Sequence, residues 1–415
     1  MDIRRTVLWM IFSFSLLLLW NNWQIHNGKP SLFGGPTPAA STNANGTPAA
    51  ANSATPSVPN APTAASAPAP SAVPGAATPA PTRSEEVVIT TDVLRLTFDT
   101  LGAQLVRAEL LKYPATGQPD KPTVLLDRAA GLNYVAQTGV VGAGNGQSFP
   151  THQTPFRVVS TDRQLTGDNL DVTFEAESGG VKVTKTFTLH RGRYDIDVRH
   201  DLANVGSAPV TPALYLQLER DGNDPADTSS FYHTFTGMAV YSEQDKFQKM
   251  TFADIEKKKA NYIKQTDNGW IAVVQHYFAT AWVPPQGKPR SNEVLEVQKN
   301  LYAARTIEAV GEIAPGAAAR VDSHLWVGPQ DQKAMAALAP GLELVVDYGW
   351  LTIIAKPLFT LMTWLHSILG NWGWTIVALT VLIKALFYPL AAASYRSMAR
   401  MKQVAPRLQA LKEKY

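Results

Sequence analysis

Cysteine is missing from all 415 residues of the chain. Its absence excludes disulfide bonds, thiolate metal sites and a cysteine nucleophile, so packing alone must stabilise the fold. The eight histidines stand singly, without a HExxH pair, and no Walker, GxGxxG or GxSxG motif occurs. We therefore expect no enzymatic activity, no metal and no other cofactor.

His190 and His200 flank a predicted hairpin that also holds Asp195 and Asp197. Because side chains alternate along a strand, both carboxylates turn outward while the apolar residues between them turn inward. This pattern favours a solvated strand face over a metal or acid–base site.

Charged side chains are scarce as well, at 17% of the chain, and the formal net charge is only +3. No long basic patch precedes residue 394, so direct nucleic-acid binding has little electrostatic support. Between Lys29 and Arg83 there is no charge at all, and Pro, Ala, Ser, Thr, Gly and Asn make up almost the whole segment. Such a composition cannot offset its ordering entropy. We expect residues 29–84 to be a disordered linker.

An uncharged apolar run stands at the N-terminus, over residues 6–23, directly after Arg4 and Arg5. A cleaved secretory signal peptide is one interpretation. However, no A-x-A-like cleavage site follows, the run is longer than a typical signal core, and Trp20 and Trp23 resemble an interfacial aromatic anchor. These features favour an uncleaved transmembrane signal anchor over residues 1–28, with its N-terminus in the cytoplasm.

Residues 85–345 alternate between apolar and polar side chains with a period of two, which is typical of strands that bury one face. The pattern predicts a large antiparallel β-sandwich. We expect two short helices within it, near residues 252–260 and 330–340, and a buried strand in the aromatic stretch 269–285. We also expect residues 324–332 to fix how the β-domain meets the helix that follows. The clearest alternating sets are Leu94, Leu96 and Phe98; Leu170, Val172 and Phe174; Val181 and Val183; Phe187 and Leu189; Tyr194, Ile196 and Val198; and Leu214, Leu216 and Leu218.

Beyond residue 345 the apolar side chains recur at helical spacing. We predict a helix over residues 346–370 and a second apolar helix over 371–393, which is long enough to cross about 30 Å of hydrocarbon. The basic tail, residues 394–415, should stay cytoplasmic. A single span puts both termini inside and the β-domain outside, so we place 346–370 flat on the outer membrane surface. The residues expected at this interface are Trp350, Lys356, Leu361 and Trp364.

The second apolar helix contains one cation, Lys384. A charge at the centre of a bilayer helix costs roughly 2.5 to 3.5 kcal/mol on insertion scales. One interpretation is a lysine that snorkels to the cytoplasmic headgroups. The other is a charge that faces a water-filled recess, where it attracts polar or acidic groups of a passing polypeptide and where Thr375 and Thr380 add polarity. We expect Tyr388 and Pro389 to end the regular helix near the inner face.

Several segments together resemble the YidC/Oxa/Alb family of membrane protein insertases in its Gram-negative form. The likeness covers essentially the whole chain except the linker. The matching segments are RRTVLWMIFSFSLLLLWNNW (4–23), GWIAVVQHYFATAWVP (269–284), LWVGPQDQKAMAALAP (325–340), VDYGWLTIIAKPLFTLMTWLHSILGNWGWTIVALTVLIKALFYPL (346–390) and SYRSMARMKQVAPRLQALKEKY (394–415).

The resemblance implies an inner-membrane protein with a first span, a periplasmic β-supersandwich, an amphipathic helix on the periplasmic surface, and core helices around a hydrophilic groove. The groove cation falls at Lys384, with Thr375, Thr380 and Tyr388 as its neighbours. The implied function is insertion and folding of nascent membrane proteins, alone or beside the Sec translocon, without nucleotide or metal. The basic tail would begin a cytoplasmic helical hairpin that contacts substrate or ribosome.

Two features depart from the family pattern. The family more often has arginine where this chain has Lys384, so the charge is kept without the bidentate fork. The chain also stops at Tyr415, inside the expected hairpin. We therefore expect either a C-terminally truncated insertase, as a piece of a longer protein, or a product that is not competent for insertion. The rival hypotheses are a membrane-tethered carbohydrate-binding or carbohydrate-active β-sandwich and one half of a channel or transporter.

Overall fold

The structure is a computed structural model that describes residues 84–129, 131–142, 148–225, 234–346, 348 and 352–414, with side chains up to Met401 in the last helix. All of these belong to the compact unit formed by Ala67–Tyr415. The predicted signal anchor and the linker up to Arg83 lie outside the described residues, and so does Trp350.

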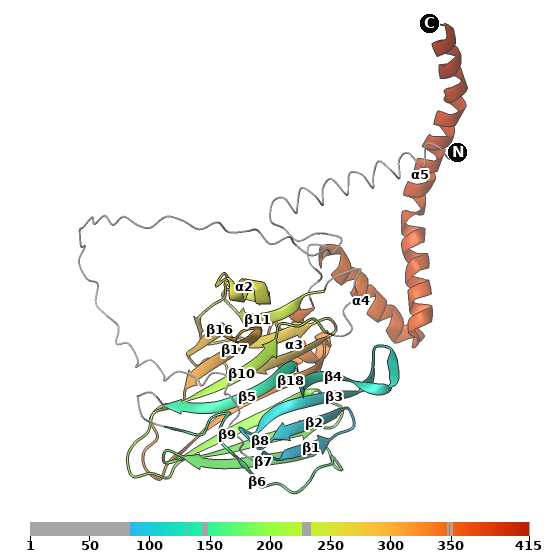
Figure 1. Cartoon of the computed structure of the whole chain (residues 1–415). Helices are drawn as coiled ribbons and strands as arrows, with labels where there is room; N and C mark the ends of the chain where they lie inside the picture. The colour runs from blue at the N-terminus through green and yellow to red at the C-terminus, as the bar shows by residue number, and fades with distance from the viewer. Residues whose placement is uncertain are drawn as a thin grey trace, which may run out of the picture. The chain divides into compact units, whose positions relative to one another are not determined.

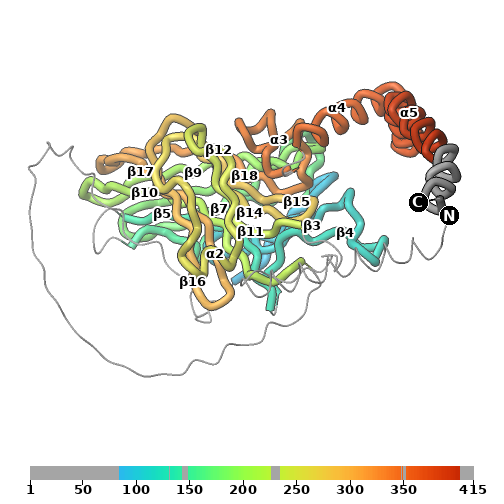
Figure 2. Tube along the Cα trace, turned by 90° about the horizontal axis from the view of Figure 1, so that it is seen from above, coloured from blue at the N-terminus to red at the C-terminus, as the bar shows by residue number. Residues whose placement is uncertain are grey.

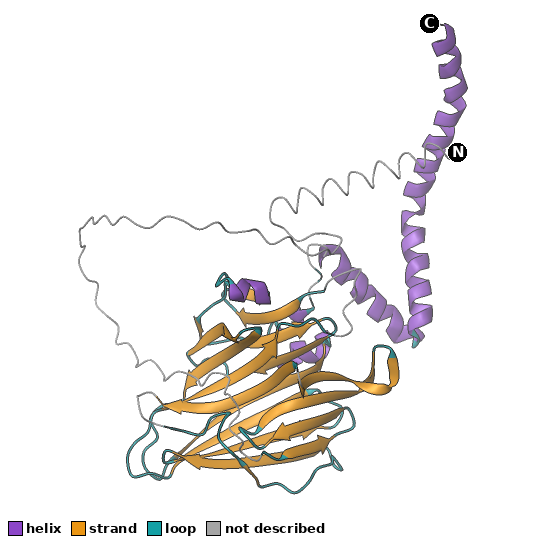
Figure 3. Ribbon diagram, in the orientation of Figure 1, coloured by secondary structure: helices purple, strands orange, loops and turns teal. Residues whose placement is uncertain are grey.

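Two antiparallel sheets build the described part of the β-domain (Figures 1 and 3). The first sheet has the strand order β1-β2-β3-β4-β5-β10-β17-β16-β13, and the second has the order β12-β11-β14-β15-β18-β9-β8-β7-β6. The first sheet consists of β1 (Glu86–Thr90), β2 (Leu94–Asp99), β3 (Gln104–Ala115), β4 (Gln118–Ala129), β5 (Leu132–Gly142), β10 (Pro212–Asp221), β17 (Leu301–Ala309), β16 (Arg290–Gln298) and β13 (Gln265–Thr266). The second consists of β12 (Lys246–Met250), β11 (Thr236–Ser242), β14 (Trp270–Gln275), β15 (Phe278–Val283), β18 (Ala318–Pro329), β9 (Asp195–Asn204), β8 (Val181–His190), β7 (Asn169–Ser178) and β6 (Arg157–Val158).

The main hydrophobic core lies between the two sheets and is built by the alternating apolar residues of both. On β2, for example, Leu94, Leu96 and Phe98 are all buried, and the ring of Phe98 packs against Phe174 of β7 and Phe187 of β8 with centroid distances of 5.6 and 4.8 Å. The predicted antiparallel sandwich is thus confirmed, because a period of two places every second side chain in this core.

Three strands contradict the prediction of one wet face, because β10, β14 and β15 are buried at every residue. For β14 and β15 the reason is a second, smaller core on the outer face of their sheet. Met335 of helix α3 (Gln332–Leu338) and Leu342 and Val345 of the 3₁₀ helix η1 (Leu342–Val345) pack there. The aromatic stretch 269–285 therefore forms two buried strands, and not one.

The two short helices predicted within the β-domain are confirmed, although both are shorter than expected. Helix α2 spans Phe252–Glu256 and α3 spans Gln332–Leu338. Asp331 caps α3, since its carboxylate accepts hydrogen bonds from the backbone N–H groups of Lys333 (3.0 Å) and Ala334 (3.2 Å). Trp270 on β14 donates its indole N–H to the carbonyl of Pro340 (3.2 Å), which ties the chain after α3 to the sheet.

The alternation predicts solvated carboxylates at Asp195 and Asp197, which is wrong for Asp195, whereas the side chain of Asp197 is 44% exposed. Asp195 is buried and forms an ion pair with Arg193. Asp197 lies between two histidines, 2.8 Å from Nε2 of His190 and 2.7 Å from Nδ1 of His324. His324 comes from β18, which pairs with β9, so its contact with Asp197 joins residues far apart in the chain.

Candidate functional site

Two helices follow the β-domain, α4 (Thr352–Leu369) and α5 (Trp372–Lys414). Among the described residues these are the two helices that are long and apolar enough to cross a membrane. Apolar side chains on both helices are exposed, including Ile353 and Trp364 on α4 and Val381 and Leu386 on α5. Exposed apolar side chains in such number need an apolar solvent or partner, which a bilayer supplies.

A tight turn joins the two helices (Figure 1), and Figure 2 shows α5 nearly end-on beyond α4. Gly370 has φ +64°, the left-handed conformation that ends a helix with little strain only at glycine, and its N–H donates to the carbonyl of His366 (2.8 Å). Asn371 then caps α5, because its side-chain oxygen accepts from the N–H of Gly373 at 2.8 Å. The ring of His366 stacks on Trp372 with a centroid distance of 3.8 Å. Gly373 is already part of α5.

Three of the predicted groove residues share one face of α5. Thr380, Lys384 and Tyr388 are four residues apart, so each is rotated by about 40° from the one before. Lys384 and Tyr388 are exposed, and Thr380 donates its hydroxyl to the carbonyl of Ile376 at 2.8 Å. They form a continuous strip, which we call the Lys384 face.

Thr375, the fourth predicted groove residue, does not lie on the Lys384 face. Nine residues separate it from Lys384, which places it about 180° around the helix. It is fully buried near the junction where α4 packs against α5, and its hydroxyl donates to the carbonyl of Asn371 (2.8 Å). The helical periodicity of the sequence predicts that Thr375 lies opposite Lys384, whereas the hydroxyl group of Thr375 alone does not.

Lys384 lies in the middle of an otherwise uncharged stretch of α5. The nearest charged residue toward the C-terminus is Arg396, and no charged residue stands between Trp372 and Lys384. Twelve residues on either side correspond to about 18 Å of helix. To bring its ammonium group to the headgroups, a snorkelling Lys384 would therefore have to span much of a leaflet with its own side chain.

Helix α5 continues through Pro389 to Lys414, so the prediction that Tyr388 and Pro389 end the helix is wrong. Proline removes one backbone N–H and one hydrogen bond, but the residues around it keep theirs. In an apolar surrounding no water replaces backbone partners, which favours a continued helix over an early end. The 43 residues of α5 extend about 65 Å, more than twice the thickness of a hydrocarbon core.

On α4 the structure describes three of the four predicted interface residues. Lys356 and Trp364 are exposed and Leu361 is partly buried. Together with Thr352, Ile353, Pro357 and Thr360 they surround one shallow, mostly apolar depression along the helix. Positions 357, 361 and 364 follow the i, i+4, i+7 spacing of a single helical face, which is consistent with an apolar strip that ends in an indole.

Comparisons with known proteins match both halves of this architecture. A family model described as the YidC periplasmic domain matches residues 86–361, and one described as the 60Kd inner membrane protein matches residues 364–415. The membrane protein insertase YidC of Bordetella parapertussis is 79% identical over 421 residues, which cover 100% of this chain and 74% of that protein. The protein of the same name from a Janthinobacterium species is 48% identical over 422 residues, covering 100% and 73%.

Solved structures resemble the β-domain only distantly. A galactose mutarotase related enzyme from Lactobacillus acidophilus has a TM-score of 0.38 and 7% identity, and the match covers 59% of this chain and 97% of that one. A likeness of this size carries no functional argument. The family matches favour the insertase interpretation over the carbohydrate and transporter alternatives.

Proposed function

Because this chain belongs to the YidC family of membrane protein insertases, which are inner-membrane proteins acting on nascent membrane proteins, we propose that the Lys384 face lines a hydrophilic groove for the polar parts of those substrates. The observation that carries the proposal is the position of Lys384, a single cation at the centre of an apolar helix, with Thr380 and Tyr388 on the same face. The action needs no covalent chemistry.

The energetics favour a hydrated groove over a lipid-facing lysine. An ammonium group in hydrocarbon is penalised, whereas one in a narrow polar recess keeps its water and still attracts acidic and polar groups. Attraction across about 4 Å grows from about 1 kcal/mol in bulk water to about 4 kcal/mol at an effective dielectric constant of 20. A translocating segment would therefore exchange part of its hydration for contacts with Lys384, Thr380 and Tyr388.

The proposed topology follows from charge and length. We assign residues 1–28 and the apolar half of α5, residues 372–393, as spans, with both chain ends cytoplasmic and the β-domain, residues 85–345, periplasmic. Helix α4 would lie on the periplasmic membrane surface, anchored by Trp350, Lys356, Leu361 and Trp364. The basic half of α5, residues 394–414, would reach into the cytoplasm and contact the ribosome through its positive charge. Cooperation with the Sec translocon belongs to the same proposal.

The test separates the charge of Lys384 from its shape. Lys384→Ala removes the cation, and we expect insertion of substrates with polar translocated segments to fall about tenfold, which corresponds to about 1.4 kcal/mol. Lys384→Arg keeps the cation and should be tolerated. Leu386→Ala, about 200° around the helix from Lys384, is the matched control and should leave insertion unchanged. Growth of cells depleted of their own insertase, together with protease protection of a radiolabelled substrate, measures the effect. An alanine variant as active as the unsubstituted protein would refute the groove assignment.

A further inference from the structure

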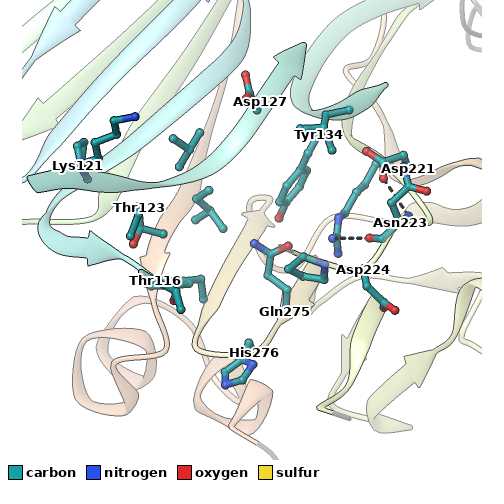
Figure 4. A pocket seen from close by; sticks show the side chains of 18 of the residues that line it. Thr116, Lys121, Thr123, Asp127, Tyr134, Asp221, Asn223, Asp224, Gln275 and His276 are labelled. Carbon is teal, nitrogen blue, oxygen red and sulfur yellow. Dashed lines mark hydrogen bonds between the residues drawn. The ribbon is translucent and has the colours of Figure 1, made fainter. Parts of the chain in front are cut away.

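A pocket with a volume of about 400 Å³ lies between strands β4, β5 and β10 and the turn that joins β14 to β15 (Figure 4). Its size is within the range of sites for small ligands, about 300 to 1,000 Å³. The membrane-insertion proposal makes no use of it. Its floor contains a buried cation, Arg220, near the end of β10.

Arg220 is unusual because it is buried without a carboxylate partner among the described residues. It is only 5% exposed, Nη2 donates to the backbone carbonyl of Asn223 (3.2 Å), and Nη1 has no hydrogen-bond partner. The rings of Tyr134 and Phe252 lie 5.4 and 5.8 Å from the guanidinium carbon. Leaving a buried N–H group unsatisfied costs about 1 to 3 kcal/mol, and more when the group is charged.

The adjacent acid, Asp221, makes no hydrogen bond or ion pair with this arginine in the described part of the chain, and its two oxygens face backbone donors instead. Asp221 accepts hydrogen bonds from the backbone N–H of Asn133 (2.7 Å) and of Asn223 (2.9 Å). Burial lowers the pKa of Arg220, and the carboxylates of Asp221 and Asp224 oppose that effect. A guanidinium nevertheless remains protonated in proteins. The floor therefore offers a permanent positive charge with an unused hydrogen-bond donor.

Two further polar groups converge on the same space. In Figure 4 the hydroxyl of Tyr134 points toward the amide of Gln275, and a dashed line marks the hydrogen bond from Arg220 to Asn223. The Tyr134 hydroxyl is buried beside the hydroxyl of Thr280, with which it makes no hydrogen bond of normal geometry. Burial raises the pKa of Tyr134 to about 12, so at neutral pH it is a hydrogen-bond donor. Arg220, Tyr134 and Gln275 together form a set of donors suited to a carboxylate.

The rim of the pocket selects against ligands with several negative charges. Asp221 and Asp224 line it together with one lysine, Lys121, and with Asp127, whose carboxylate is already paired with Arg107 (2.9 Å). Phosphates and acidic polymers would meet repulsion from these acids, whereas a ligand with one carboxylate and a neutral or basic remainder would not. Apolar side chains, Val124, Leu125, Leu132 and Phe278, form the wall and suit an aliphatic group next to that carboxylate.

We propose that this pocket binds the free C-terminal carboxylate of a peptide, with Arg220 as its anchor and the last side chain on the apolar wall. Capture of a C-terminal carboxylate by a few convergent donors is a recurring mode of peptide recognition. A sugar acid fits less well, because Tyr134 and Phe278 are 5% and 8% exposed and present no open ring face on which a sugar could stack.

The experiment uses the full chain in detergent and two probes, the tripeptide lysyl-alanyl-leucine with a free carboxylate and the same tripeptide with a C-terminal amide. We expect the free acid to bind at least tenfold more tightly than the amide by isothermal titration calorimetry. Arg220→Gln should abolish this preference, while Arg163→Gln, at a surface site away from the pocket, should preserve it. Because Arg220→Gln alters a buried position, Leu132→Trp provides a second variant that fills the rim from an exposed residue and should weaken binding by a similar factor.

Several results would contradict binding of a C-terminal carboxylate in this pocket. Equal affinity for acid and amide, or no binding of either by the unsubstituted chain, would overturn it. Tighter binding of glucuronate than of the tripeptide would overturn the peptide assignment in favour of a sugar acid. If circular dichroism shows that Arg220→Gln is unfolded, unchanged binding by folded Leu132→Trp would still overturn the proposal.

Discussion

Two lysines of this protein occupy surroundings in which lysine is rare, and they are accommodated differently. Lys185 on β8 is completely buried in the sandwich. Its ammonium donates to the carbonyls of Gly102 (2.7 Å) and Thr138 (2.8 Å) and lies 4.5 Å from the centroid of the Phe156 ring. Lys384 is exposed on a helix without comparable contacts in the described part of the chain. The first lysine stabilises a defined core arrangement, while we propose that the second contacts the substrate.

The burial of Lys185 predicts a pH dependence of stability. Burial lowers the pKa of this lysine from 10.5 to about 7 in the folded protein. Between these two values the unfolded chain binds more protons than the folded one, so the free energy of unfolding rises with pH across this window. Lys185→Met keeps the length of the side chain without a proton to lose. We expect it to flatten the rise between pH 7 and pH 9.5, as measured by urea unfolding of the full chain.

The control for that measurement is Lys182→Met on the same strand, because Lys182 is partly exposed and pairs with Glu175 at the surface (3.1 Å). It should leave the slope of stability against pH unchanged. An equal slope for Lys185→Met and the unsubstituted protein would mean that Lys185 keeps its ordinary pKa, contrary to the prediction.

Although helix α3 is short, it covers part of the outer face of the second sheet. Its seven residues bury Met335 completely against the outer face of the second sheet, next to Leu342 of η1. We expect Met335→Ala to destabilise the β-domain by about 2 to 5 kcal/mol, because it leaves a cavity in a packed layer. Lys333→Ala, at an exposed position of the same helix, should change stability by less than about 0.5 kcal/mol. Thermal unfolding followed by near-ultraviolet circular dichroism distinguishes the two, and similar melting temperatures would refute the packing argument.

Proline and glycine are both signals for the end of a helix, but only the glycine ends one here. Proline at position 389 suggested a helix end, yet α5 continues, because one missing N–H is a local loss and the neighbouring hydrogen bonds persist. Gly370 is the true end of α4, since its positive φ directs the chain out of the helix and Asn371 immediately caps the next one. The turn was predictable from a glycine followed by an asparagine after an apolar run.

For the whole molecule, the Lys384 face and the β-domain are separate parts, so insertion should survive removal of the β-domain. The C-terminal boundary of the deletion determines how much apolar surface is left exposed. Deleting residues 85–319 leaves most of β18, α3 and η1 without the sheet that buries Met335, Leu342 and Val345. Deleting residues 85–345 removes this apolar surface as well. We expect the longer deletion to support growth of insertase-depleted cells better than the shorter one, and loss of growth with the longer deletion at normal membrane levels would contradict the prediction.

The sequence by itself determined the periodicities. Alternation along strands and the apolar stripe along a helix come from local backbone geometry, so the sandwich, the two apolar helices and the isolated charge at Lys384 follow from residue order alone. Only the tertiary structure decided what lies across from what. It placed Thr375 away from Lys384 in a buried junction, covered β14 and β15 with α3 and η1, and set His324 beside Asp197. It also left Arg220 at the floor of a pocket without a carboxylate partner from the described residues. Such pairings join residues far apart in the chain, and their energies depend on burial and distance, which no local pattern specifies.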